Sequence, residues 1–267
     1  MTSPQNPALV VVSHYDAWPT ADLERLVSQM SAIDAGMPFD LCIVVNSEIG
    51  KKINSIGGAK VLYRPNTGYN IGAWQYGWEQ NPGYEFYLFL QDECVIRKPG
   101  WLRAFRDVAN ISGVGLVGES IVYHNSWSEY EKYRGFYETC RDICQDIGIS
   151  LGNNPTHLQS LVIGARGDAL KAIGGFVLTS GGKIEAIATE VLTSIRARAL
   201  GYRIAQVSWR PFEYIYHPQW ASLREQSSRL SWTMSKIFYE YLPEQFNYKL
   251  RRIMKRDNAS KASSASR

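Results

Sequence analysis

The sequence predicts an α/β protein with a mainly parallel central sheet and helices on both of its faces. Four apolar runs (residues 8–12, 40–45, 60–63 and 86–90) have the length and composition of buried strands. They alternate with segments of helical periodicity and are separated by short turns, which is typical of a parallel sheet. Ligands of such sheets bind at the carboxyl ends of the strands. Polar residues at these ends are therefore the first candidates for a site.

The run 86–90 is the strand around which this prediction is organised. It follows Asn81-Pro82-Gly83 and ends at the polar residues Gln91, Asp92 and Glu93. An acidic pair at the carboxyl end of a buried strand stands where a metal or a substrate would lie. The alternative for such a pair is a solvated strand end.

The other elements are expected in the following order. The strand 8–12 leads into residues 13–16, and a helix follows because apolar residues recur at helical spacing: Leu23, Leu26, Val27 and Met30. The strand 40–45 ends at Asn46. The strand 60–63 leads into a polar, glycine-rich segment that opens a helix through Trp74 and Trp78.

Residues 113–118 match the spacing of a dinucleotide-binding glycine motif. We interpret them as a short strand instead, because the glycines interrupt an apolar run and do not join a strand to a helix. The region 119–154 has the weakest pattern and is expected to contain a substrate-specific insert. The four cysteines lack the spacing of a metal site and are expected to be buried thiols: Cys42, Cys94, Cys140 and Cys144.

Composition excludes several functional classes. The 267 residues are 45% hydrophobic and 20% charged, as in a soluble globular protein. The net charge of +4 is uneven, since the chain from residue 246 carries +6 and the remainder −2. A nucleic-acid-binding surface on the fold is therefore not expected. No apolar run is long enough to span a bilayer, and residues 1–7 lack a secretory signal, so a cytoplasmic location is predicted.

Three downstream stretches resemble family 2-type glycosyltransferases of the GT-A fold. Residues 161–170, followed by the turn 174–176, resemble the family's strand, short helix and Gly-Gly-Phe turn. Glu190, with Arg196 six residues later, resembles its acidic-residue helix. His217 resembles the histidine after the last core strand.

Two upstream stretches extend the resemblance over roughly residues 8–222. Residues 10–16 are similar to the opening strand, and Asn66, Gly68 and Gly72 to the Asn-x-Gly segment. The form of that segment is closest to transferases that build rhamnan or O-antigen polysaccharides. The chain departs from the family in having Gln91-Asp92-Glu93 for Asp-x-Asp, Glu190 for Asp, and Asn46 where an Asp is frequent.

The resemblance implies a metal-dependent, inverting glycosyltransferase. It would move a sugar from a nucleotide-diphosphate donor to a glycan or lipid-linked glycan acceptor in cell-envelope polysaccharide synthesis. Mn²⁺ or Mg²⁺ would offset the charge that develops on the departing diphosphate. The metal ligands implied are Asp92, Glu93 and His217, and which carboxylate faces the metal is open. Without the family pattern, His217 would be interpreted as a packed histidine.

Glu190 is the general base that the resemblance implies, and Glu185 is its competitor. An exposed acid at a helix N-terminus is the alternative interpretation of Glu190. The donor would be bound along the strand ends and the glycine-rich segment, where glycines allow close backbone approach, although turns also need glycine. The donor-binding residues implied are His14, Asp16, Asn46, Arg64, Asn66, Gly68, Asn70, Gly72, Gln91 and Asp92.

Two other functions compete with transfer. A sugar nucleotidyltransferase shares the sheet, but it should have a glycine-rich, basic loop after the first strand, which residues 13–16 do not provide. A non-catalytic glycan-binding domain would explain the many Trp and Tyr residues.

The chain is expected to divide into a catalytic domain (1–222), a helical extension (223–258) and a disordered tail (259–267). Apolar residues of the extension recur at helical spacing, and its end is basic. A basic amphipathic helix suits an anionic membrane surface. A peripheral location on the inner face of the plasma membrane is therefore predicted, with a frayed C-terminus as the alternative.

Overall fold

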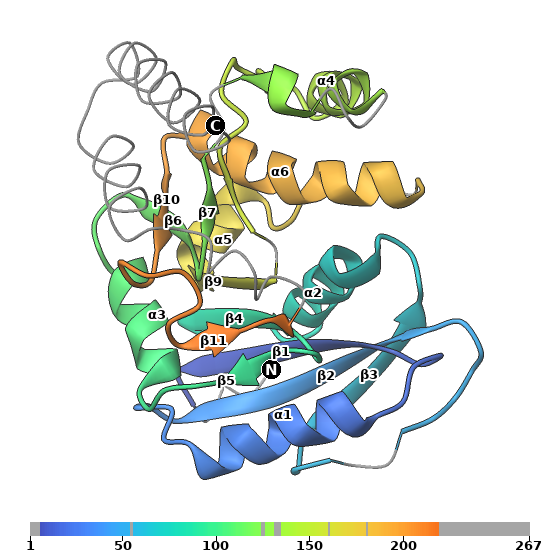
Figure 1. Ribbon diagram of the computed structural model, residues 1–267, viewed down its shortest axis with the longest axis vertical. Coiled ribbons are helices and arrows are strands. Elements are labelled where there is room, and N and C mark those ends of the chain that lie inside the picture. The colour runs from blue at the N-terminus through green and yellow to red at the C-terminus, as the bar shows by residue number, and fades with distance from the viewer. Residues whose placement is uncertain are drawn as a thin grey trace, which may run out of the picture. The chain divides into compact units, whose positions relative to one another are not determined.

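The computed structural model describes residues 6–53, 56–123, 126–130, 135–159, 161–179 and 181–218 (Figure 1). All of them belong to one compact unit, Met1–Arg224. The predicted helical extension (223–258) and tail (259–267) lie outside the described residues.

A seven-stranded sheet forms the centre of this unit, in the order β10-β6-β9-β4-β1-β2-β3. Neighbouring strands run parallel except at β9, which is antiparallel to both β4 and β6. The prediction of a mainly parallel sheet is confirmed. The strands are β1 (Ala8–Tyr15), β2 (Phe39–Ser47), β3 (Lys60–Pro65), β4 (Phe86–Gln91), β6 (Val114–Gly118), β9 (Val162–Arg166) and β10 (Arg203–Gln206).

Two short antiparallel ribbons accompany the sheet. One pairs β5 (Val95–Ile96) with β11 (Ile215–Tyr216), and the other pairs β7 (Ile121–Val122) with β8 (His157–Leu158). The first ribbon matters for the site, because it joins the residues that follow β4 to a segment near the end of the described chain.

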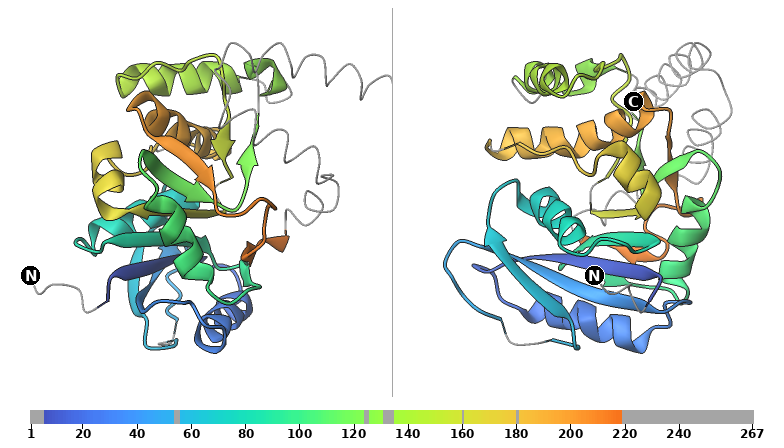
Figure 2. Two further views of the ribbon diagram at one scale, coloured as in Figure 1. Left: turned by 90° about the vertical axis from the view of Figure 1, so that its left-hand side faces the viewer. Right: turned by 180° about the vertical axis from the view of Figure 1, so that it is seen from behind.

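Helices lie on both faces of the sheet (Figures 1 and 2). Val10 and Val12 of β1 belong to a core shared with α1 and α3. Val11 points to the opposite face, where α2 approaches so closely that a methyl group on Gly77 would lie 2.5 Å from Val11 Cγ1. The helices are α1 (Ala21–Ala32), α2 (Tyr69–Glu79), α3 (Trp101–Ala109), α4 (Phe136–Asp146), α5 (Gly167–Ile173) and α6 (Lys183–Ala199), with a 3₁₀ helix at Trp127–Tyr130.

The strand pattern of the sequence agrees with the burial of the strands. Every residue of β4 is buried, as expected for an apolar run covered on both faces. In α1, the four apolar residues predicted to share a face (Leu23, Leu26, Val27 and Met30) are all buried. Residues 114–118 form the buried strand β6, so the interpretation of their glycines as strand residues is confirmed.

The weakly patterned region packs on α6. Trp127, Tyr130 and Phe136 share a buried cluster with Val191 and Leu192 of α6. α4, which follows in this region, also lies beside α6 (Figure 1). The region thus supports the helix that carries Glu190.

The four cysteines are buried free thiols, as predicted. Burial raises the pKa of Cys140 to about 12, with neighbouring Cys144 adding to the effect. It likewise raises the pKa of Cys42 to about 11.

Within the described part of the chain, no helix combines the length and apolarity needed to cross a membrane.

Candidate functional site

The carboxyl ends of β1, β2 and β4 lie side by side. Ser13 of β1 is in register with Gln91 of β4, and Tyr15 of β1 with Asn46 of β2. The backbone N–H of Asp92 continues the ladder by donating to the Ser13 carbonyl oxygen at 3.2 Å. Parallel pairing therefore brings the predicted donor and metal residues of three separated segments to one edge of the sheet.

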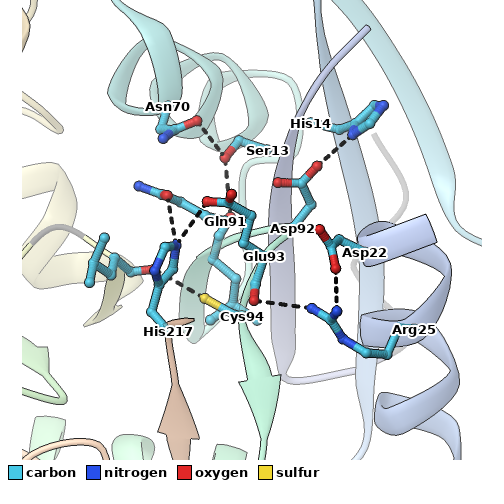
Figure 3. A network of polar contacts seen from close by, with 12 residues as sticks. Ser13, His14, Asp22, Arg25, Asn70, Gln91, Asp92, Glu93, Cys94 and His217 are labelled. Atoms are coloured by element: carbon cyan, nitrogen blue, oxygen red, sulfur yellow. Dashed lines mark hydrogen bonds and ion pairs between the residues drawn. The ribbon is translucent and has the colours of Figure 1, made fainter. Parts of the chain in front are cut away.

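The acidic pair after β4 divides between two histidines (Figure 3). Asp92 Oδ2 lies 2.5 Å from His14 Nδ1, and both residues are buried. Glu93 Oε2 lies 3.2 Å from His217 Nε2, and the Glu93 side chain is 33% exposed. The side chains of Asp92 and Glu93 point in opposite directions, so the two carboxylates have different partners. Asp92 pairs with His14, and Glu93 faces His217.

His217 is a neutral, buried imidazole in this arrangement. Its Nε2 also lies 3.2 Å from Gln91 Oε1. Burial lowers the pKa of His217 to about 4, although Asp92 opposes this shift. Burial, reinforced by the charges of Asp92 and Asp22, raises the pKa of Glu93. A neutral imidazole beside carboxylates is the form in which histidine binds metals.

The donor set suits a hard divalent cation. Within the described residues, no three His, Cys, Asp or Glu side chains converge as a metal cage. Mg²⁺-type ions in nucleotide sites are held by one or two protein carboxylates together with substrate phosphates, so a full protein cage is not required. Glu93 and His217 face each other at 3.2 Å, whereas Asp92 is paired with His14. Glu93 and His217 fit a cation whose remaining ligands come from a diphosphate.

The glycine-rich segment after β3 is shaped by Arg64 and Asn46. Arg64 Nη1 donates to Asn46 Oδ1 at 2.6 Å, and Nη2 donates to the Thr67 carbonyl oxygen at 2.7 Å. Asn46 Nδ2 donates to the Tyr69 carbonyl oxygen at 3.0 Å. Arg64 and Asn46, which are predicted to bind the donor, therefore hold the backbone of the glycine-rich segment. A ligand would contact the surface of that segment.

Two glycines of the segment are required by its geometry. Gly68 has φ of +69°, a conformation that glycine adopts without strain. Gly72 lies against the Arg64 guanidinium, and a methyl group there would lie 2.9 Å from both of its terminal nitrogens. Turn formation accounts for Gly68 and close packing for Gly72, so neither needs a ligand to explain it.

Asn66 and Asn70 lie at the two ends of this segment. Asn70 Oδ1 accepts a hydrogen bond from Ser13 Oγ at 3.1 Å, which ties the start of α2 to the end of β1 (Figure 3). Asn66 Nδ2 lies 3.4 Å from Glu48 Oε2, which also accepts from the Tyr15 hydroxyl. Their predicted contacts with a donor remain predictions.

Asp16 organises the loop after β2. Its carboxylate accepts the Ser47 hydroxyl at 2.8 Å and the backbone N–H groups of Glu48, Ile49 and Lys51 at 2.9 to 3.2 Å. Burial raises the pKa of Asp16, but these hydrogen bonds together outweigh it and bring the pKa down to about 2. A base or ribose that contacts Asp16, as predicted, would compete for a carboxylate that already accepts hydrogen bonds from Ser47 and three backbone N–H groups.

Asp16→Asn is expected to destabilise the protein in a pH-dependent way. A folded-state pKa below the ordinary value means that the carboxylate stabilises the fold above about pH 4, and that this contribution is lost as the pH falls through about 2. The difference in unfolding free energy between wild type and variant should therefore shrink between pH 4 and pH 2. Urea unfolding across this range measures it, with exposed Asp107→Asn as the control. A difference that does not change with pH would contradict this assignment.

The Gly-Gly-Phe turn connects α6 to α2. Arg196 Nη2 donates to the carbonyl oxygens of Gly174, at 3.2 Å, and of Gly175. Gln75 Oε1 accepts the backbone N–H of Phe176 at 2.8 Å. The Phe176 ring meets Phe89 of β4 edge-on, with ring centroids 4.8 Å apart. α6 is thereby fastened to the strand that ends at the acidic pair.

The two candidate bases lie in different parts of α6. Glu185, in the first turn, folds back over the preceding glycines, since a methyl group on Gly181 would lie 2.6 Å from its carboxyl carbon. A glutamate at this position commonly reaches back to the helix start. Glu190 lies in the middle of the helix and is partly buried. The structure therefore gives Glu185 a local role at the helix start. The assignment of the general base to Glu190 remains a prediction.

Three residues that support the site were not predicted from the sequence in these roles. They are Glu119, Gln75 and Arg196, which donates to the carbonyl oxygens of the Gly-Gly-Phe turn. Glu119 follows the buried strand β6 directly and is itself 1% exposed. The rule that selected Asp92 and Glu93, an acid at the carboxyl end of an apolar strand, could have selected Glu119. Nothing in the sequence pattern distinguishes Gln75 from the other polar residues of its helix.

No protein-family model and no curated protein matches the chain. Among solved structures it is similar to a mannosyltransferase, PcManGT from Pyrobaculum calidifontis, in complex with GDP-Man and Mn²⁺ (11% identity, 91% of this chain, 72% of that chain, TM-score 0.49). It is also similar to glucosyl-3-phosphoglycerate synthase from Mycobacterium tuberculosis in complex with Mn²⁺, UDP and phosphoglyceric acid (13% identity, 90% and 80% coverage, TM-score 0.47). At this level of similarity, the activity of the chain cannot be inferred from these structures. It has to be inferred from the contacts of the chain itself.

Proposed function

We propose that this chain is a GT-A-type glycosyltransferase that uses a nucleotide-diphosphate sugar and a divalent cation, Mn²⁺ or Mg²⁺. The main support is the 3.2 Å contact between Glu93 Oε2 and His217 Nε2 at the carboxyl edge of the sheet, where Asp92 precedes Glu93 in the chain. Hard oxygen ligands and a neutral imidazole at this edge suit a cation that bridges to a diphosphate. The glycine-rich segment after β3 borders the same edge and would face the nucleotide.

In the proposed reaction, the acceptor hydroxyl oxygen forms a bond to the anomeric carbon of the sugar. The bond from that carbon to the diphosphate oxygen breaks, and the nucleoside diphosphate leaves with the electron pair. Glu190 takes the proton of the acceptor hydroxyl on the face opposite the leaving group, which inverts the anomeric centre. A bound cation would neutralise charge on the diphosphate.

The donor class is tested by thermal stabilisation with a panel of nucleotide-diphosphate sugars, each with and without MnCl₂. A ligand that binds only the folded protein raises its melting temperature. We expect one nucleotide series to raise it, and to do so more strongly with Mn²⁺. No shift with any member of the panel would contradict the proposal.

We further propose that the acceptor belongs to a cell-envelope polysaccharide, such as O-antigen, and is carried on a lipid at the inner face of the plasma membrane. The support is the sequence of the helical extension, whose basic residues Lys249, Arg251, Arg252, Lys255 and Arg256 flank an apolar stripe. Each basic residue near an anionic surface contributes about 1 kcal/mol.

Truncation after Tyr248 is accordingly expected to weaken co-sedimentation with anionic liposomes and to leave activity on a soluble acceptor unchanged. The full-length and truncated proteins are compared on vesicles with and without phosphatidylserine. Equal binding by the two proteins would exclude the extension as an anchor.

A further inference from the structure

Glu119 connects two distant parts of the chain through its carboxylate. Oε1 accepts the backbone N–H groups of Tyr214 at 3.0 Å and Ile215 at 2.5 Å, and Oε2 accepts that of Glu213 at 3.0 Å. Successive backbone N–H groups that converge on one anion form a nest. Glu119 follows β6 directly, so this nest fastens residues 213–215 to the end of a central strand.

The segment held in this way leads directly to His217. β11 ends one residue before His217, and β5 begins two residues after Glu93. The two strands pair with Tyr216 opposite Val95. Their pairing brings the imidazole to its place beside Glu93 and Gln91 (Figure 3).

The β5–β11 ribbon is too short to fix this place by itself. It has two residues in each strand, and an isolated two-stranded ribbon is marginally stable in water at best. Phe212, just before the nest, has φ of +55°, which a non-glycine residue keeps only where its surroundings enforce it. The three hydrogen bonds that Glu119 accepts constrain the backbone next to Phe212, because they fix the three residues that follow it.

We propose that Glu119 is a positioning residue for His217. By holding the backbone of residues 213–215, it sets the distance between the His217 imidazole and the Glu93 carboxylate, and thus the spacing of the cation ligands. The part that concerns the cation rests on the proposed function, whereas the placement of the ring rests on the contacts alone. Both side-chain oxygens of Glu119 accept from these backbone donors, and the hydrogen bonds oppose the burial that raises its pKa to about 8. A glutamine would turn an NH₂ group toward one of the N–H donors.

The placement is tested by NMR of the histidine rings in protein labelled with ¹⁵N-histidine. Glu119→Gln should shift or broaden the ring signals of His217, assigned by comparison with His217→Ala, and leave those of His14 in place. Glu213→Gln is the matched control, since it removes the ion pair of the same segment with Lys98 but keeps the backbone donors that Glu119 holds. A surface ion pair contributes little, so this variant should leave the His217 signals unchanged. Unchanged His217 signals in folded Glu119→Gln would overturn the proposal, even if the melting temperature fell.

The link to the cation is tested by a double-mutant cycle on the affinity for a nucleoside diphosphate in the presence of Mn²⁺. Glu119→Gln and His217→Ala should each weaken this affinity at least tenfold, and the double variant should be no weaker than the worse single variant. If the fold-loss of affinity in the double variant equals the product of the two single losses, Glu119 does not act through His217. If Glu119→Gln does not fold, Glu119→Asp replaces it, because it keeps the carboxyl group and should give smaller changes in the same direction. Unchanged ring signals of His217 in Glu119→Asp would again overturn the proposal. Failure of the wild type to bind any nucleoside diphosphate with Mn²⁺ would refute the proposed function, while the NMR result would still decide the placement.

Discussion

Glu190→Gln is expected to lower the rate of sugar transfer by about 10²–10⁴-fold, the usual contribution of a general base. Glutamine keeps the shape of the side chain and removes its ability to take the acceptor's proton. The cation ligands belong to other elements, so donor affinity should stay close to that of the wild type. Steady-state rates, together with calorimetric titration of the donor, separate the two effects.

Glu185→Gln is the matched control for this experiment, because it makes the same change on the same helix. Its side chain folds back over the glycines that precede α6, so we expect a small loss of stability and near-normal turnover. If Glu185→Gln inactivates the protein and Glu190→Gln does not, the general base is Glu185.

Replacement of both Asp92 and Glu93 by alanine is expected to abolish cation-dependent donor binding. The two residues follow β4, and neither belongs to the apolar core that the strand forms with its neighbours, so the fold should survive. Calorimetric titration of the donor with Mn²⁺ measures the loss, and circular dichroism checks the fold. An unchanged donor affinity in the double variant would refute this metal assignment.

The single variants distinguish the two carboxylates. Glu93 faces His217, whereas Asp92 is paired with His14 at 2.5 Å. Glu93→Ala should therefore remove most of the cation dependence. Asp92→Ala leaves the buried His14 without its partner, and should lower stability as well as affinity. Asp107→Ala, at an exposed position on α3, should change neither.

The sheet could be predicted from the sequence because its signals are local. Each parallel strand is a short apolar run with a turn at its end, and α1 shows its buried face in the spacing of four residues. The same locality placed the acidic pair at the end of β4. The direction of β9 could not be predicted, because the sequence pattern of a buried apolar strand is the same whether its neighbours run parallel or antiparallel to it.

The contacts that decide the roles of site residues could not be predicted, because they join segments far apart in the chain. The different contacts of Asp92 and Glu93 depend on two distant histidines. His14 lies 78 residues before its partner Asp92, and His217 lies 126 residues after Gln91, which it contacts together with Glu93. Asp16 and Arg64 are predicted to contact the donor, and in the structure both hold the backbone of a loop. A polar residue at a strand end can serve either purpose, and only the three-dimensional contacts tell which.

We propose that the edge formed by Glu93, His217 and the glycine-rich segment transfers a sugar from a nucleotide diphosphate. The decisive experiment incubates the protein with the donor that stabilises it and measures the products with and without Mn²⁺. We expect release of the nucleoside diphosphate, dependent on Mn²⁺ and lost in Glu93→Ala. Consumption of added pyrophosphate, with formation of a nucleoside triphosphate and a sugar 1-phosphate, would indicate a nucleotidyltransferase. Binding of a glycan without any cleavage of the donor would indicate a binding domain. Either outcome would contradict the proposed transferase.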